Sequence, residues 1–237
     1  PNCPQFVIAY YGILKAGGTV VNFSPLYALP ELEHQARDSD TRIMVTLNLE
    51  ALYPKMQALF EKRLLEKVIV GTLSEALPFI PGVLFPLVRR KEVVPLPKEG
   101  DTHIYWRTVL SSPAISDLPS IDPDNDIAVL QYTGGTTGTP KGAALTHRNL
   151  YANTLQCVRW MTDTEDGNGS ILGALPFFHV FAMTTIMNFS ICKGLCILMH
   201  PRFELKRVLQ DIDKKEPTLM PGVPTMYTAI NNYPQLK

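Results

Sequence analysis

Short apolar runs rich in β-branched residues alternate with helix-forming segments along most of the chain, and this alternation restricts the fold more than any other feature. Successive parallel strands cannot be joined by tight turns and need crossover connections, which are usually helices. The pattern therefore predicts an α/β fold with a mostly parallel, doubly wound sheet and helices on both faces. The expected strands are residues 19–21, 42–46, 67–70, 127–133, 171–176, 195–199 and 218–220, and the expected helices are residues 5–16, 31–39, 50–65, 146–161, 180–193 and 204–215.

A proline-rich segment, residues 71–126, interrupts this alternation. Its prolines are too frequent for regular elements, so we expect an irregular excursion between the first α/β units, residues 1–70, and the later ones, residues 127–237. At its centre, residues 77–91 (LPFIPGVLFPLVRRK) place an apolar run before three cations. This composition suits peripheral contact with an anionic membrane surface. The alternative is that the segment is buried over the sheet and only its cations are solvated.

Composition excludes several classes of protein. Lys plus Arg and Asp plus Glu number 22 each, so no global field draws the chain to nucleic acid. The four cysteines form no CxxC pair, which disfavours zinc or disulfides and favours small buried side chains in a reducing cytoplasm. No charged start precedes an apolar core, so neither a signal peptide nor a transit peptide is expected. Residues 170–192 are uncharged, but polar residues and a proline interrupt them, so a buried strand, loop and helix fit better than a membrane span.

The sequence YTGGTTGTPKG, residues 132–142, follows directly after an expected strand. Open α/β sheets bind ligands outside the carboxyl ends of their strands. The glycines, Gly142 included, allow positive φ and close approach of the backbone, the threonines add hydroxyl donors, and the lysine supplies a mobile positive charge. Consecutive backbone N–H groups in such a loop form a concave anion site, which predicts a bound polyphosphate. The residues expected to hold it are Thr133, Gly134, Gly135, Thr136, Thr137, Gly138, Thr139 and Lys141.

The spacing of this loop differs from that of a Walker A loop. A Walker A loop has glycine directly before its lysine and Ser or Thr directly after it. Here Pro140 precedes Lys141 and Gly142 follows it, so the pattern disfavours a P-loop ATPase or kinase. A flexible glycine linker with an incidental lysine is an alternative, but it does not explain why the loop joins a strand to a helix.

Several motifs together resemble the adenylate-forming superfamily, which includes acyl-CoA synthetases, luciferases and the adenylation domains of peptide synthetases. YTGGTTGTPKG followed by LTHRN is similar to its signature phosphate loop. The resemblance to bacterial long-chain fatty acid CoA ligases extends over nearly all of the chain. It is carried by KAGGTVVNFSPLY at 15–27, ELEHQ at 31–35, LPFFHVFA at 175–182 and GVPTMYTAI at 222–230.

The resemblance implies part of the large N-terminal domain of an enzyme that uses ATP, Mg²⁺ and coenzyme A to activate a fatty acid. A fatty carboxylate attacks the α-phosphorus to give an acyl adenylate and pyrophosphate, and the acyl group then passes to the coenzyme A thiol. It further implies that Lys141 and the loop neutralise phosphate charge, and that Thr133 lies in the outer environment of Mg²⁺. His179, with Phe177 and Phe178, is expected to position the substrate carboxylate, although a lone histidine after an apolar run is more often structural. His147 is expected to cap or brace the helix that follows it.

The acyl chain has candidate contacts in two places. The first is the expected helix after His179, and the second follows the last expected strand near Gly222. Apolar side chains at helical spacing are more often core than pocket, and this alternative stays open. The candidates are Val180, Phe181, Met183 and Met187, then Gly222, Val223, Pro224, Thr225 and Met226.

The chain also departs from the family pattern. The resemblance implies a tyrosine–threonine–glutamate element, a ribose-binding aspartate and a mobile C-terminal domain beyond Lys237, so residues 1–237 are interpreted as an incomplete N-terminal domain, cut at both ends. This piece alone is then expected to be inactive and prone to self-association through apolar faces. Two alternatives are a noncatalytic module that binds nucleotide or fatty acid, and a ligase for an aryl or amino acid.

Overall fold

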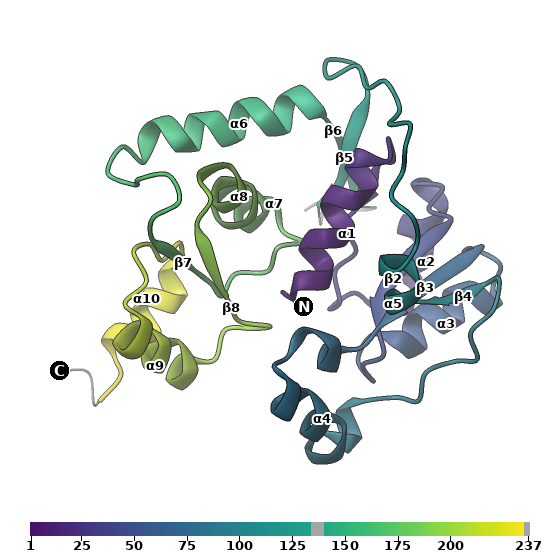
Figure 1. Cartoon of the computed structure of the whole chain (residues 1–237), viewed down its shortest axis with the longest axis horizontal. Helices are drawn as coiled ribbons and strands as arrows, with labels where there is room; N and C mark the ends of the chain where they lie inside the picture. Colours follow the sequence, from purple (N-terminus) through teal and green to yellow (C-terminus); the bar gives the residue numbers. More distant parts are fainter. Residues whose placement is uncertain (134–139, 235–237) are drawn as a thin grey trace. The chain divides into compact units, whose positions relative to one another are not determined.

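A computed structural model describes residues 1–133 and 140–234 of the chain (Figure 1). It divides into two compact units that each combine separate segments. The first unit consists of Pro1–Val7, Asp122–Ala128 and Leu145–Lys237. The second unit consists of Ile8–Ile121 and Val129–Ala144. Each is described by itself.

The second unit contains a parallel sheet with strand order β2-β3-β4, from β2 (Ile43–Leu47), β3 (Lys67–Gly71) and β4 (His103–Tyr105). Helix α2 (Leu29–Asp38) precedes β2, helix α3 (Tyr53–Glu61) connects β2 to β3, and both helices pack on this sheet. The packing is apolar because the strands and helices each direct one hydrophobic face inward. The buried cluster is formed by Leu32, Met44, Met56, Leu59, Leu65, Val68 and Val70.

A separate sheet carries the phosphate-loop strand. Its order is β1-β5-β6, from β1 (Val20–Val21), β5 (Ile127–Thr133) and β6 (Lys141–Thr146). Strands β1 and β5 are parallel, with Val20 opposite Val129. Helix α1 (Pro4–Lys15) leads into β1 and ends at a turn where Gly17 has φ of 76°. A Cβ at this glycine would lie 2.8 Å from Pro119 Cγ, so both the conformation and the close contact require glycine.

The proline-rich excursion, residues 71–126, holds more regular structure than the sequence predicted. It contains η1 (Leu73–Ala76), α4 (Phe79–Val88), η2 (Arg90–Glu92), β4 and α5 (Trp106–Leu110). The prediction of an irregular segment was therefore wrong for these stretches, whereas residues 93–102 and 111–126 lie outside the helices and strands. Helix α4 accommodates Pro81 because the N–H groups of the first helical turn have no intrahelical partner. Pro86 lies within the helix, where it has no N–H to donate to the carbonyl of Gly82, four residues before it.

The first unit is built around β7 (Ser170–Gly173) and β8 (Cys196–Met199), which are parallel. A parallel bridge from Ile171 to Leu219 extends this sheet, so residues near the expected strand 218–220 run alongside β7. The helices of the unit are α6 (His147–Trp160), α7 (Val180–Ala182), the π-helix η3 (Met183–Asn188), α8 (Phe189–Lys193), α9 (Leu205–Lys215) and α10 (Pro224–Asn231).

The α/β class is confirmed, and the elements expected at 5–16, 31–39, 127–133, 146–161 and 204–215 agree with the structure to within two residues. Three differences stand out. Within residues 1–133 and 140–234, the strands form three separate sheets instead of one, β6 follows the phosphate loop, and α10 follows residues 218–220. The expectation of four buried cysteines was also wrong, because Cys192 and Cys196 are exposed.

Candidate functional site

The phosphate loop leaves from the carboxyl end of a strand, as the sequence predicted. Thr133 is the last residue of β5 and Lys141 is the first residue of β6, and both are exposed. The other residues expected to bind phosphate, Gly134, Gly135, Thr136, Thr137, Gly138 and Thr139, lie outside the described residues. Strands β5 and β6 are neighbours in the same sheet, and the side chains of the two residues that flank the loop are accessible.

Helix α2 contacts the residues on each side of this loop. Tyr132, at the end of β5, is 6% exposed, and its hydroxyl donates a hydrogen bond to the Asp38 carboxylate. On the other side, His34 Nε2 lies 3.3 Å from the carbonyl oxygen of Pro140. Gly142 passes close to the Tyr132 ring, where an added Cβ would be 3.0 Å from two ring carbons. Of the two uses of glycine that the sequence suggested, positive φ and close approach of the backbone, Gly142 serves the second within β6.

Burial and the hydrogen bond to Asp38 raise the pKa of Tyr132 to about 12, from an ordinary value of 10.0. Because the folded state favours the neutral phenol, this contribution to stability is complete below about pH 10 and is lost between about pH 10 and pH 12. We expect the free energy of unfolding, measured with urea, to fall more steeply over this range in the wild type than in Tyr132→Phe. At pH 8, the variant should be about 1 kcal/mol less stable. Tyr151→Phe, at an exposed position, is the control, and equal pH dependence of Tyr132→Phe and wild type would contradict the assignment.

In the first unit, the segment after β7 carries His179 at the N-terminus of α7. The His179 side chain is exposed, and its Nδ1 accepts a hydrogen bond of 3.4 Å from the backbone N–H of Phe181. With Nδ1 acting as the acceptor, the ring hydrogen lies on Nε2, which can then act as a donor. Phe178 is half-buried, whereas Phe177 is only 1% exposed and its ring centroid lies 6.2 Å from that of Phe6.

Asn2 holds the backbone of this segment in place from a distant part of the sequence. Its side-chain Nδ2 donates to the carbonyls of Gly173 at 3.0 Å and Leu175 at 2.8 Å. Its Oδ1 accepts from the N–H of Phe177 at 2.8 Å, and the residue is 3% exposed. Sequence reasoning missed this residue because a single asparagine near the start of the chain carries no local pattern. A buried amide with three backbone bonds fixes the path that leads to His179.

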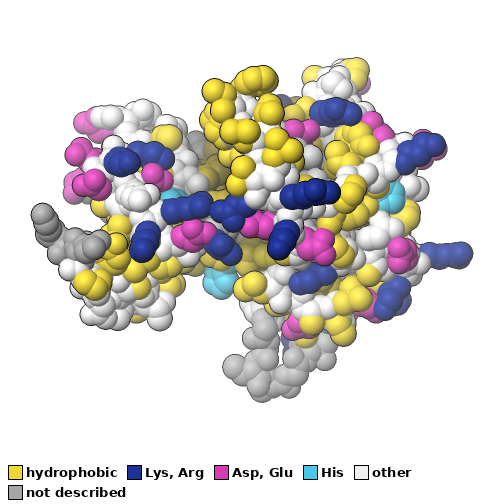
Figure 2. All heavy atoms as spheres, turned by 90° about the horizontal axis from the view of Figure 1, so that it is seen from below, with side chains coloured by type: hydrophobic (Ala, Val, Ile, Leu, Met, Phe, Trp, Pro, Cys, Tyr) yellow, Lys and Arg dark blue, Asp and Glu magenta, His cyan; other side chains and the backbone are white. Residues whose placement is uncertain are grey.

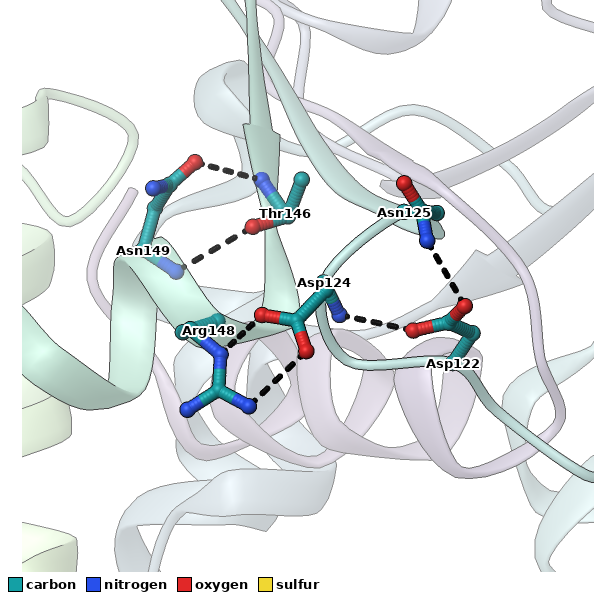
Figure 3. A network of polar contacts seen from close by, with 6 residues as sticks. All are labelled: Asp122, Asp124, Asn125, Thr146, Arg148 and Asn149. Carbon is teal, nitrogen blue, oxygen red and sulfur yellow. Dashed lines mark hydrogen bonds and ion pairs between the residues drawn. The ribbon is translucent and has the colours of Figure 1, made fainter.

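A polar network fixes the start of α6 (Figure 3). Thr146 caps the helix by accepting from the N–H of Asn149 at 3.2 Å, and Asn149 accepts in return from the N–H of Thr146 at 3.0 Å. Arg148 pairs with Asp124 through both its Nε and its terminal nitrogen, and the hydrogen bond lowers the pKa of Asp124. The cap is thus Thr146, and His147, expected to cap or brace the helix, is its first residue.

Asp122 completes this network from the neighbouring loop. It accepts hydrogen bonds from the side chain of Asn125 at 2.8 Å and the backbone N–H of Asp124 at 3.0 Å, which lower its pKa. Figure 3 shows the Asp124 carboxylate directed at the guanidinium of Arg148, while the backbone N–H of Asp124 points to Asp122. The loop before β5 and the first turn of α6 are thereby joined within the first unit.

Helix α6 also forms one wall of a pocket in the first unit, with a volume of about 530 Å³. The other walls come from α7, η3 and α8 and from the segment that ends at Pro221, next to Gly222. Gly222 itself lies close to the Tyr227 ring, where an added Cβ would be 2.9 Å from Cζ. The lining residues are Asn153, Gln156, Cys157, Trp160, Met161, Phe181, Thr185, Phe189, Leu219, Met220 and Pro221.

The candidate acyl-chain residues divide into three groups in the structure. Phe181 lines the pocket. Met183 and Met187 are fully buried, and Met226 is 5% exposed, so these three belong to the packed interior. Val180, Val223, Pro224 and Thr225 are exposed around the start of α7 and α10. Sequence reasoning missed the contribution of α6 to the pocket, because Trp160 and Met161 stand at its end without a motif.

The two halves of the expected site fall in different units. Thr133 and Lys141 belong to the second unit, whereas His179 and Gly222 belong to the first. Their convergence on a single substrate therefore stays a prediction, as do the individual roles of the site residues. Within each unit, the arrangement is chemically coherent: an exposed cation beside a strand end in one, and an exposed histidine near an apolar pocket in the other.

Comparison with known proteins identifies the class. The family model described as AMP-binding enzyme matches residues 1–237, and the chain belongs to this family. It is 42% identical over 239 residues to a long-chain-fatty-acid–CoA ligase of Bacillus subtilis, covering 100% of the chain and 42% of that protein. It is 32% identical to 4-coumarate–CoA ligase 1 of Arabidopsis thaliana, covering 97% of the chain and 38% of that protein. The chain thus spans less than half the length of these relatives.

A solved structure supports the same fold. The crystal structure of a long-chain-fatty-acid–CoA ligase from Archaeoglobus fulgidus aligns with a TM-score of 0.75 and 25% sequence identity. The alignment covers 98% of this chain and 40% of that protein. The expected membership of the adenylate-forming enzymes is therefore confirmed for the chain.

Proposed function

We propose that the whole protein is a long-chain fatty acid CoA ligase that uses ATP, Mg²⁺ and coenzyme A. The observation that carries this proposal is the exposed pair Thr133 and Lys141 flanking a glycine- and threonine-rich loop at a strand end, in a chain 42% identical to a ligase of this kind. Such a loop can bind the phosphates of ATP through backbone N–H groups and hydroxyls. The cellular setting that we propose is the cytoplasm, including the inner face of the membrane.

The first step joins a fatty carboxylate to the nucleotide. A carboxylate oxygen forms a bond to the α-phosphorus, and the bond from that phosphorus to the bridging oxygen breaks, which releases pyrophosphate. The departing group gains negative charge, and a cation placed beside it lowers the barrier. We assign this role to Lys141, and the outer environment of Mg²⁺ to Thr133. Mg²⁺, when bound, neutralises phosphate charge.

The second step transfers the acyl group to coenzyme A. The thiol sulfur bonds to the acyl carbon, the bond from that carbon to the phosphate oxygen breaks, and AMP leaves while the thiol proton passes to solvent or a base. We propose that His179 orients the substrate carboxylate before the first step, through a hydrogen bond from Nε2. The hydrogen bond from Phe181 N–H to Nδ1 supports this donor role. Phe178 and Val180 flank the histidine on the same segment.

We propose that the pocket beside α6 receives the acyl tail. Its volume of about 530 Å³ falls within the range of small-molecule sites, and most of its lining is apolar. We place the entrance of this pocket at Gly222, which follows the lining residue Pro221 directly and is one of the candidate acyl-chain contacts. Val223 and Pro224, exposed at the start of α10, would border that entrance.

Filling this pocket tests its role. Thr185→Trp adds an indole to the lining. Forcing extra volume into packed apolar space costs about 1 to 3 kcal/mol, and here we expect that cost to fall on binding of the acyl tail. We expect KM for palmitate to rise about tenfold or more, while kcat/KM for butyrate stays within about twofold. Tyr151→Trp, which adds an indole to an exposed position of α6 outside the lining, is the control. Equal losses for palmitate and butyrate would exclude the pocket as the site of the acyl tail.

The ligase activity itself is tested by the products it forms. The protein in the longest form that its gene encodes, here called the gene-encoded form, is incubated with ATP, Mg²⁺, coenzyme A and one carboxylate at a time. We expect mass spectrometry to detect palmitoyl-CoA in excess over coumaroyl-CoA. Product from coumarate or an amino acid alone would replace this proposal with the aryl or amino acid alternative. Nucleotide binding without any thioester would favour a noncatalytic module, and we expect residues 1–237 alone to give no product.

A further inference from the structure

Helix α4, in the second unit, exposes an almost entirely apolar surface. Six of its ten residues are large hydrophobic side chains that are between 48% and 85% exposed. None of its residues is buried. Isolated exposed apolar side chains are common, but a contiguous group on one element usually marks an interaction site. The six are Phe79, Ile80, Val83, Leu84, Leu87 and Val88.

These side chains lie on one side of the helix. Residues 79, 83 and 87 form one row at a spacing of four, and residues 80, 84 and 88 form the adjacent row. The opposite side is directed at the protein, because a Cβ on Gly82 would lie 2.9 Å from the carbonyl oxygen of Ser74 in η1. The small residue thus lets the helix pack closely on η1 while both apolar rows face outward. The alternative that this segment is buried over the sheet was wrong.

Positive charge adjoins the apolar rows at the end of the helix. Arg89, Arg90 and Lys91 follow directly and are exposed, and Glu92 pairs with Arg89 at 2.7 Å. Three cations and one acid leave residues 77–92 with a net charge of +2. Figure 2 views the molecule from the side on which α4 lies in Figure 1 and shows a large hydrophobic cluster bordered by Lys and Arg side chains.

We propose that α4 and residues 89–91 form a docking surface for an anionic lipid membrane, with the apolar rows in the interface and the cations at the headgroups. Charge complementarity selects this partner, since apolar insertion beside a basic cluster is the combination that anionic bilayers bind. A helix of ten residues is about 15 Å long and lies in the interface, because a bilayer core is about 30 Å thick. No helix in the part of the chain that the structure describes is long and apolar enough to cross a bilayer.

A second copy of the chain is a poorer occupant of this surface. Pairing two copies through parallel α4 helices would bring two clusters of Arg89, Arg90 and Lys91 toward one another, with a single acid, Glu92, beside each. Antiparallel pairing would place each cluster beside the apolar first turn of the other helix. Like charges that meet in an interface disfavour association. A membrane surface supplies the opposite charge over a wide area, so it satisfies both features of the helix at once.

The test is co-sedimentation of the gene-encoded form with phosphatidylcholine vesicles that contain or lack phosphatidylglycerol, without ATP, fatty acid or coenzyme A. We expect binding to the anionic vesicles that weakens as salt is raised. Val83→Ser/Leu87→Ser should weaken the partition coefficient about tenfold or more through lost apolar contact. The triple change Arg89→Gln, Arg90→Gln and Lys91→Gln should weaken it about tenfold or more through lost charge.

Matched variants separate this surface from general effects. Leu26→Ser/Ile115→Ser removes two exposed apolar side chains elsewhere in the second unit and should leave binding unchanged. The changes Lys206→Gln, Arg207→Gln and Lys214→Gln remove three exposed cations of α9, including one paired at i,i+3 as Arg89 is. Thermal melting verifies that each variant is folded. Equal binding to neutral vesicles, no binding to either kind, self-association through α4 in place of vesicle binding, or equal losses in the control variants would overturn the proposal.

Discussion

Lys141→Ala should lower fatty-acid-dependent exchange of pyrophosphate into ATP by about 100- to 1000-fold in the gene-encoded form. Removing one charged or hydrogen-bonding group that stabilises a transition state typically has an effect of this size. The side chain is exposed at the first position of β6, so its loss should leave the melting temperature nearly unchanged. The reduction would then come from weaker neutralisation of the departing pyrophosphate.

A suitable control for Lys141 is another exposed lysine that begins a strand. Lys67 is the first residue of β3 and is exposed in the same unit. Lys67→Ala should retain exchange within about twofold, because surface substitutions rarely have larger effects. If Lys141→Ala also retained exchange within this range, the assignment of its charge to the pyrophosphate would be wrong.

Phe177→Ala should destabilise the first unit by about 3 to 5 kcal/mol, since truncation of a buried phenylalanine removes its packing and leaves a cavity. The ring is 1% exposed, contacts Phe6 and lies near Gly173, where a Cβ would be 3.3 Å from Cζ. The backbone N–H of Phe177 is also held by Asn2. For a protein of this size, the loss corresponds to a fall in melting temperature of about 6 to 20 °C.

Phe178→Ala provides the neighbouring comparison. Phe178 is half-buried, so its truncation should destabilise the unit by about 1 kcal/mol. Urea unfolding, followed by circular dichroism, measures both changes. A cost for Phe177→Ala no larger than that for Phe178→Ala would show that Phe177 is not part of the core. Its sequence-based role beside the substrate would then be the better interpretation.

Much of the fold could be predicted from local pattern. The β-branched run that ends in Thr133 and the periodic segment after Thr146 each fix an element by short-range rules. The grouping of strands into three sheets could not be predicted in this way, because pairing depends on contacts such as Val20 with Val129, far apart in sequence. Strand β6 was missed because its residues follow a loop dominated by turn-forming types.

In the candidate site, the residues that lie in motifs could be predicted from the sequence, and the residues that support them could not. The phosphate loop and the segment that contains His179 have motifs, so their residues could be named from the sequence. Supporting residues have no such signal: Asn2 acts on a backbone more than 170 positions away, and Asp38 contacts Tyr132 of β5 from helix α2. Helix α4 is the opposite case: its apolar composition was clear from the sequence, but its exposure could not be predicted, because it depends on how Gly82 packs on η1.

The most direct measurement is ATP–pyrophosphate exchange by the gene-encoded form with Mg²⁺ and a series of carboxylates in the absence of coenzyme A. Exchange requires a reversible acyl adenylate, so it reports the first step alone and does not depend on the later thioester. We predict exchange that depends on a long-chain fatty acid and is nearly abolished in Lys141→Ala. Exchange with an aryl or amino acid but not a fatty acid, or none with any carboxylate, would contradict the proposed function.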